Sequence, residues 1–306
     1  MKWRNLLKTC KEFQKKEKRA YCYDIYMKNN GRGWFKDKRL PEVEIMKLFW
    51  FVRTWDINFR GDFKQFQKIY GKIYPSIKLL KSQKIEDIDF NKKTKDKKNK
   101  DRIMNIFDKV TKCGKNGRGE WTDTSKILHC ILPKLFVMWD VEIRKGIWRK
   151  NRKIWKRPKN DKFTGKEYAF YFLPKMKEEA NNVIERYRTD HNHCTRRQAI
   201  KEISKKGRDH TIAKLLDEFN YVIYTIKQSP ILVIYDLQID LPLDGLATRS
   251  DLTSLSEERV TAKVRESLRL TFNNNSVTVA CEAHHNKRGW KGHGTLNRKE
   301  FTWRVY

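Results

Sequence analysis

The sequence lacks any long apolar run. None of its apolar stretches approaches the roughly 18 residues that a membrane-spanning helix needs, so we expect no transmembrane segment. The first residues, Met-Lys-Trp-Arg-Asn-Leu-Leu-Lys, begin with charge but have no apolar stretch behind them. This pattern is not that of a secretory signal peptide. We therefore expect a cytoplasmic protein.

The sequence also lacks a cysteine framework and a visible repeat. Its six cysteines are scattered and no two form a C-x-x-C pair, which is typical of reduced thiols rather than of disulfides. Two short clusters do contain zinc-type ligands, Asp190-His191-Asn-His193-Cys194 and Cys281-Glu-Ala-His284-His285. Neither has the spacing of a known zinc finger or ribbon. We expect no cofactor, with a zinc ion shared between these clusters as the alternative.

Acidic residues are few. There are 37 Asp and Glu against 69 Lys and Arg, which gives a formal net charge of +32. The excess is spread along the chain, and this favours a polyanionic partner: nucleic acid first and an anionic membrane surface second. Aromatic residues are abundant instead, with 10 Trp, 12 Tyr and 16 Phe. Disordered chains are poor in such residues, so we expect a folded protein.

Hydrophobic periodicity divides the chain into three parts. Residues 1–39 are basic and are expected to form a helical N-terminal arm. Residues 40–229 show repeated helical spacing, including helices near 101–112, 174–188, 195–206 and 210–226, with one helical run broken at Pro75. Residues 230–306 combine strand patterns with one helix that begins after Ser254-Leu-Ser-Glu257, and they are expected to form a small α/β unit, winged-helix-like in one interpretation. The lysine-rich residues 91–102 fit a solvated loop and a phosphate-contacting loop equally well.

The segment 113–148 carries the most specific pattern. A glycine-rich turn, Cys113-Gly-Lys-Asn-Gly-Arg-Gly119, precedes Thr122-Asp-Thr-Ser-Lys126-Ile-Leu-His-Cys130, where Thr122 to Ser125 offer N-cap side chains for a short helix. Pro133 ends that helix. A connector then leads to Val137-Met-Trp-Asp140-Val-Glu-Ile143, in which Asp140 is placed to cap the next helix.

This segment resembles the helix-hairpin-helix DNA glycosylase superfamily. The family pattern is a hairpin, a helix with Lys near its start, a connector and a helix-capping Asp. The resemblance implies a mainly α, glycosylase-like domain in which Asp140 is catalytic and, as in bifunctional members, Lys126 is the nucleophile. The chain departs from the pattern: the hairpin lacks the Leu-Pro-Gly-x-Gly order, the Lys-to-Asp interval is short, Glu142 stands where His is frequent, and the cysteine quartet of an iron–sulfur cluster is missing.

The chemistry fits these residue types. Cleavage of an N-glycosidic bond develops positive charge on the sugar, which a fixed carboxylate stabilises. A desolvated lysine amine can attack the sugar and form a Schiff base. The base must first be flipped out of the duplex into an aromatic and apolar pocket. We expect that pocket to be lined by the neighbours of the two candidates: Trp121, His129, Phe136, Trp139 and Trp148.

Basic and glycine residues around this segment and near the C-terminus are expected to hold the DNA backbone through its phosphates. These are Lys115, Gly117, Arg118, Gly119, Arg144, Lys145, Arg149, Arg265, Arg269, Lys287, Arg288 and Lys291. The expected partner is double-stranded DNA with a flipped base, in the nucleoid, with no membrane and no obligate protein partner. Repair of a lesion and attack on modified foreign DNA, as in phage defence, both remain open. A non-catalytic nucleic-acid-binding protein on the same fold and a metal-dependent nuclease are the alternatives.

Overall fold

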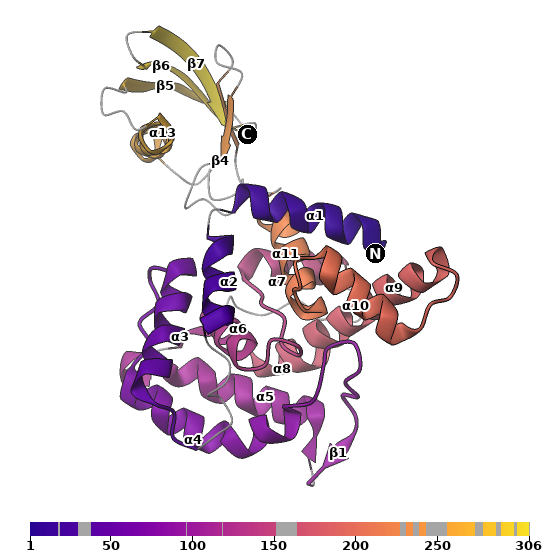
Figure 1. Ribbon diagram of the computed structural model, residues 1–306. Helices are drawn as coiled ribbons and strands as arrows, with labels where there is room; N and C mark the ends of the chain where they lie inside the picture. The colour runs from indigo at the N-terminus through magenta and orange to yellow at the C-terminus, as the bar shows by residue number, and fades with distance from the viewer. Residues whose placement is uncertain are drawn as a thin grey trace. The chain divides into compact units, whose positions relative to one another are not determined.

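The computed structural model describes most of the chain as a mainly helical protein with a small sheet near the C-terminus (Figure 1). The described residues are 1–306 without residues 18, 30–37, 96, 118, 151–163, 227–230, 235–238, 243–255, 273–277, 286–288, 297–298 and 306. They form two compact units, Met1–Val222 and Ile223–Tyr306. The sequence predicts a boundary between residues 229 and 230, and the division falls earlier, within α11 (Ile212–Tyr224).

The first unit is built from helices. Their bounds are α1 (Trp3–Lys16), α2 (Ala20–Asn29), α3 (Glu42–Trp55), α4 (Phe63–Leu80), α5 (Asn99–Val110), α6 (Trp121–Ile131), α7 (Val141–Lys150), α8 (Gly165–Glu167), α9 (Leu173–Asp190), α10 (Arg196–Lys206) and α11 (Ile212–Tyr224), with short 3-10 turns at Thr111–Cys113 and Lys115–Gly117 and a π-helical turn at Tyr168–Phe172. The helices expected near 101–112, 174–188, 195–206 and 210–226 are confirmed as α5, α9, α10 and α11. None of the helices in the described ranges is long and apolar enough to cross a membrane.

Two local predictions were wrong. Helix α4 continues through Pro75 to Leu80. Proline removes one helical hydrogen bond, but Ile73, Ile77 and Leu80 are at most 1% exposed, so burial on both sides of the proline holds the helix together. For the lysine-rich stretch the solvated-loop interpretation was wrong, because β1 (Lys93–Thr94) and β2 (Lys97–Lys98) pair as a short antiparallel hairpin that leads into α5, and the phosphate contact stays a prediction.

The basic N-terminal segment is part of the first unit and not a separate arm. Helix α1 packs against α9 and α10, and α2 packs against α3. The reason is the spacing of Leu6, Cys10 and Phe13, which are at most 5% exposed and lie on one helix face. The basic side chains of α1 occupy the opposite face.

The second unit consists of one described helix and one sheet. Helix α13 (Glu257–Phe272) packs against β5 (Thr278–His285). The sheet also contains β3 (Ile231–Ile234), β4 (Ile239–Pro242), β6 (Gly289–Leu296) and β7 (Lys299–Val305), in the order β4-β3-β7-β6-β5, with all neighbours antiparallel. In its described part this unit is a five-stranded sheet with a helix, whereas a winged-helix domain has a two-stranded wing beside several helices.

An aromatic cluster forms the core between α5, the connector after α6 and the start of α9. The ring of Trp139 lies 5.1 Å from that of Tyr168 and 4.7 Å from that of Phe172. Phe107 lies 4.7 Å from Tyr168. The Tyr168 hydroxyl donates to the carbonyl of Val137 at 2.7 Å, so its one polar group is satisfied. This cluster fixes the connector that ends at Asp140.

The core position of Trp139 gives a stability prediction. Trp139 is 1% exposed, whereas Trp50 on α3 is 55% exposed. We expect Trp139→Ala to lower the free energy of unfolding by about 3–5 kcal/mol, because it leaves a large cavity. Trp50→Ala is the matched control and should change it by less than about 0.5 kcal/mol. Urea titration followed by circular dichroism measures both, and equal effects of the two substitutions would contradict the core assignment.

Candidate functional site

Asp140 caps helix α7, as the sequence predicts. Its Oδ1 accepts a hydrogen bond from the backbone N–H of Ile143 at 2.8 Å. The preceding residue is tied to α6, because the Ser125 Oγ accepts from the N–H of Trp139 at 3.1 Å and lies 3.1 Å from the carbonyl of the same residue. The expectation that Thr122 to Ser125 supply the N-cap was wrong, because α6 begins at Trp121 after Glu120 and these residues lie inside it. The result is a half-buried carboxylate with a fixed orientation at a helix N-terminus.

Lys126 makes its ion pair with a different carboxylate. Its Nζ lies 2.7 Å from Asp123 Oδ1, one helical turn earlier, and the two side chains are 12% and 3% exposed. Burial raises the pKa of Asp123, Lys126 opposes this shift, and a hydrogen-bonded neighbour, Asp56, adds to it. The amine that we expected to act with Asp140 is thus engaged with Asp123.

Three of the five expected base-pocket residues lie in the core, so that expectation was wrong for them. Phe136 and His129 are fully buried, and Trp139 is 1% exposed. The His129 ring nitrogens contact the Tyr23 hydroxyl at 2.9 Å and the carbonyl of Phe136 at 2.5 Å. Burial lowers the pKa of His129 to about 3, so the ring stays neutral in the physiological range.

Trp121 and Trp148 are the remaining pocket candidates. They lie at the start of α6 and near the end of α7, and both residues are half-buried. Gly119 allows the Trp121 indole to lie against the backbone, since a Cβ at Gly119 would come within 2.4 Å of that ring. The glycine at this place is therefore required by close packing.

The glycine-rich turn is partly occupied by its own hydrogen bonds. The N–H of Lys115 donates to the carbonyl of Arg60 at 2.9 Å, and that of Gly117 to Gly114 at 3.0 Å. Glu120 N–H donates to Thr111 at 2.8 Å. These amides are used within the protein, so phosphate contacts here would come from exposed side chains such as that of Lys115. Arg118 lies outside the described residues.

The basic residues of α7 have different roles. Arg144 was expected on the DNA backbone, but its side chain is 4% exposed and its Nη2 contacts both carboxylate oxygens of Glu167, at 2.9 and 2.8 Å. It joins α7 to α8 and is not available at the surface. Lys145 pairs with Glu142 at 3.1 Å and is 41% exposed, and Arg149 is exposed.

In the second unit the expected backbone contacts are described only in part. Arg265 is half-buried and its Nη2 lies 3.5 Å from the carbonyl of Val279, so it faces the sheet. Arg269 is exposed. Lys287 and Arg288 lie outside the described residues, and so does the side chain of Lys291.

The first His/Cys cluster is used in packing. His191 stacks on Tyr187 with ring centroids 3.9 Å apart and contacts the carbonyl of the same residue at 2.8 Å. Asp190 accepts from Trp3 Nε1 at 2.8 Å. Among the residues that the structure describes, no group of three His, Cys, Asp or Glu is placed to hold a metal ion. The side chains of Cys281, His284 and His285 are not among them.

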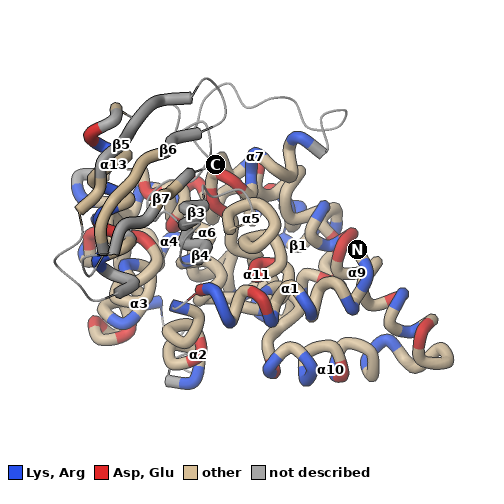
Figure 2. The backbone as a smooth tube through the Cα atoms, turned by 90° about the horizontal axis from the view of Figure 1, so that it is seen from above, with Lys and Arg blue, Asp and Glu red and all other residues tan. Residues whose placement is uncertain are grey.

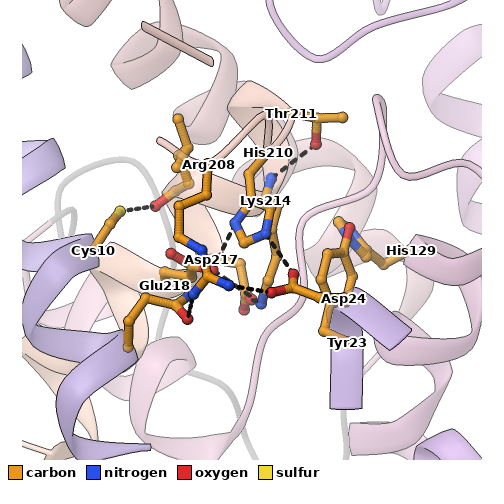
Figure 3. Close-up of polar contacts among 12 residues, drawn as sticks. Cys10, Tyr23, Asp24, His129, Arg208, His210, Thr211, Lys214, Asp217 and Glu218 are labelled. Atoms are coloured by element: carbon orange, nitrogen blue, oxygen red, sulfur yellow. Dashed lines mark hydrogen bonds and ion pairs between the residues drawn. The ribbon is translucent and has the colours of Figure 1, made fainter. Parts of the chain in front are cut away.

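The sequence reasoning missed a buried charged cluster around α11 (Figure 3). Lys214 is 1% exposed, and its Nζ lies 2.7 Å from Asp217 and 3.8 Å from Glu218. His210 bridges Glu218, at 3.0 Å, and Asp24 of α2, at 2.7 Å. We refer to these five residues as the Lys214 cluster.

Aromatic rings and two further helices complete the surroundings of the Lys214 ammonium. It lies 4.5 Å from the ring centroid of Tyr23 and 5.1 Å from that of Phe13. Such contacts stabilise a cation that has lost its water. Gln14 of α1 donates to Glu218 at 3.0 Å. The cluster thereby joins α1 and α2 to α11.

Burial and pairing act in opposite directions on these groups. Burial disfavours the charged form of Lys214, but Asp217 and Glu218 outweigh it and raise the pKa of Lys214. Burial raises the pKa of Asp217 to about 6, partly opposed by Lys214, and Glu218 and Asp140 add small increases. Burial and Glu17 raise the pKa of Tyr221, Arg19 opposes this shift, and Asp140 adds to it. Asp140 therefore interacts electrostatically with Asp217 and Tyr221 of α11.

A sequence signal for this cluster did exist. Helix α11 has apolar residues on more than one face, including Ile212, Ala213, Leu215 and Leu216, and all are at most 2% exposed. A helix that is apolar all round is buried, so the Lys, Asp and Glu that it carries must also be buried and paired. The partners from α1 and α2 could not be read from the sequence.

Comparison with models of known protein families, with curated proteins and with solved structures gives no match.

The Lys214 cluster gives a stability prediction with a pH dependence. Lys214→Met leaves Asp217 and Glu218 buried without their cation, so we expect it to lower the free energy of unfolding at pH 8 by about 3–5 kcal/mol. The loss should be smaller at pH 5. A carboxyl whose pKa is raised in the folded state, as that of Asp217 is to about 6, favours folding when it is protonated and loses this contribution as the pH rises through 6.

Denaturant titrations at pH 5 and pH 8 measure this difference. Lys201→Met on the exposed surface of α10 is the control and should change the stability by less than about 0.5 kcal/mol at either pH. A loss for Lys214→Met that is equal at the two pH values would contradict the assignment.

Proposed function

We propose that this protein is a base-excision enzyme that cleaves the N-glycosidic bond of a damaged or modified base in DNA. The observation that carries the proposal is the position of Asp140, which is half-buried, caps α7 at 2.8 Å and ends a connector held to α6 through Ser125. The order of these parts is the one in which the sequence resembles helix-hairpin-helix DNA glycosylases. The proposal assigns no particular base.

The chemistry follows from the fixed carboxylate. The helix N-terminus and the Ile143 N–H favour its charged form and fix its direction. A carboxylate that needs no reorientation stabilises the sugar cation as the glycosidic bond breaks. It can also accept a proton from the water that attacks the sugar. Trp121 and Trp148 are the aromatic side chains proposed to receive the flipped base.

We propose that Lys126 is a structural residue and takes no part in the reaction. A lysine nucleophile must lose its proton and reach the sugar. Here the Nζ contacts Asp123 at 2.7 Å and the side chain is 12% exposed, so the ion pair would have to break first. This contact favours monofunctional excision, in which water attacks the sugar and no Schiff base forms.

The charge distribution supports DNA as the substrate. Lys and Arg occur on helices throughout the described part of the chain (Figure 2), in keeping with the net charge of +32. Neutralisation of backbone phosphates by such residues gives affinity that depends steeply on salt and little on sequence. We propose a nucleoid-associated enzyme. The second candidate, a non-catalytic DNA-binding protein, rests on the same charge and would bind without releasing a base.

Asp140→Asn tests the catalytic carboxylate. Asparagine caps helices as well as aspartate does, so the fold should be kept, while loss of the negative charge should slow base release by about 10²-fold or more. The assay measures free base from a panel of damaged, modified and phage-type DNAs. Asp62→Asn is the matched control, because Asp62 caps α4 in the same way through Gln65 N–H at 2.6 Å. Full excision by Asp140→Asn would rule the mechanism out.

Borohydride trapping tests the role of Lys126. We expect the active enzyme to release base without forming a covalent adduct with DNA in the presence of borohydride. Lys126→Gln should then keep most of its activity, as should the control Lys47→Gln, which removes an ion pair with a carboxylate three residues earlier. A trapped adduct that disappears in Lys126→Gln and persists in Lys47→Gln would show instead that Lys126 is the nucleophile.

A further inference from the structure

The β1–β2 hairpin is a lysine-rich projection of the first unit. Its register pairs Lys93 with Lys98 and Thr94 with Lys97. Lys93, Lys95 and Lys97 are exposed, and no ion pair involves any of them among the residues that the structure describes. Lys95 has a φ of 48°, which is uncommon for a residue other than glycine. The charges of Lys93 and Lys97 are therefore carried by paired strands.

The hairpin is fixed to the start of α5. Asn99 donates from its backbone N–H to the carbonyl of Lys92 at 3.1 Å and from its side chain to the carbonyl of Asp89 at 2.7 Å. The N–H of Lys100 donates to the carbonyl of Phe90 at 3.1 Å. These hydrogen bonds fix the position of the lysine charges relative to α5.

Arg102 lies beneath the hairpin and is the more unusual residue. It is 5% exposed, and its Nη2 donates to the carbonyl of Thr94. Within the described ranges it has no carboxylate partner, and its Nε has no hydrogen-bond acceptor. A buried cation without an anion is costly, and burial lowers the pKa of Arg102 accordingly. An anion held by the hairpin would offset that cost.

We propose that the β1–β2 hairpin binds the phosphate backbone of duplex DNA, with Lys93 and Lys97 contacting phosphates from its two faces, Lys95 at its turn and Arg102 bonded to the carbonyl of Thr94. This inference rests on the proposed function, since it gives that enzyme a DNA contact away from Asp140. A membrane surface fits less well, because lasting contact with lipid needs apolar side chains and residues 91–98 are Asn-Lys-Lys-Thr-Lys-Asp-Lys-Lys.

The test compares two triple substitutions in the full chain. Lys93→Gln, Lys95→Gln and Lys97→Gln together remove the charges of the hairpin. Lys8→Gln, Lys11→Gln and Lys15→Gln together remove the same number from the exposed face of α1, which Figure 1 shows at the opposite end of the first unit. Fluorescence anisotropy measures the affinity for an unmodified duplex over a range of salt concentrations.

Each lost phosphate contact should reduce the slope of log K against log salt by about 0.9. We expect the magnitude of this slope to be smaller than in the unmodified protein by about two to three for the hairpin variant, and by less than about one for the α1 variant. Equal losses in the two variants would mean that only the total charge matters and would overturn the proposal. An unchanged slope in the hairpin variant would overturn it too, as would loss of binding to phosphatidylserine vesicles without loss of binding to DNA.

Arg102→Met isolates the buried charge. We expect weaker DNA binding, by at least about threefold, with no fall in melting temperature, because methionine fills similar space without a charge to desolvate. A lower melting temperature with unchanged binding would show that Arg102 only holds the hairpin.

These DNA-binding measurements need no base release. If the hairpin variant binds DNA poorly but no substrate releases a base, the excision proposal fails and the hairpin proposal stands. If bases are released while the hairpin variant binds DNA normally, the hairpin proposal fails and the excision proposal stands.

Discussion

The first unit depends on the burial of one lysine. Lys214 lies inside the helical core with Asp217 and Glu218, and a charge in that position is tolerated only when its partners are fixed around it. Both carboxylates lie on the same helix as Lys214, and His210 and Gln14 extend the network from Glu218 to Asp24 of α2 and to α1. Burial of the cluster therefore depends on α1 and α2 packing against α11.

The candidate site is built beside this network from a second set of constraints. The connector after α6 is held by the contact of Ser125 with Trp139 and by the aromatic cluster around Tyr168. Its last residue, Asp140, is thereby delivered to the start of α7. Asp140 therefore combines the fixed direction of a helix cap with a place in a strongly basic protein, and the proposed chemistry rests on this combination.

The sequence predicted local features better than it predicted which residues meet. Asp140 was identified as a cap because the cap is a contact between neighbours along the chain. Trp139, Phe136 and His129 were assigned to a pocket because they are close to Asp140 in sequence, yet they face the core. Arg144 was assigned to DNA for its charge, and its bidentate contact with Glu167 depends on how α7 and α8 pack.

Composition and periodicity were enough to indicate a folded, mainly helical and basic protein with a small sheet near its C-terminus, because the spacing of apolar residues follows the geometry of helices and strands. They were also enough to locate Asp140 at a helix start. The pairing of Lys126 with Asp123, the burial of Lys214 and the position of Arg102 beneath a lysine hairpin arise from packing. A side chain acquires its partners and its solvent exposure from segments distant in sequence, and those determine whether a charge stabilises the fold, binds a ligand or takes part in a reaction.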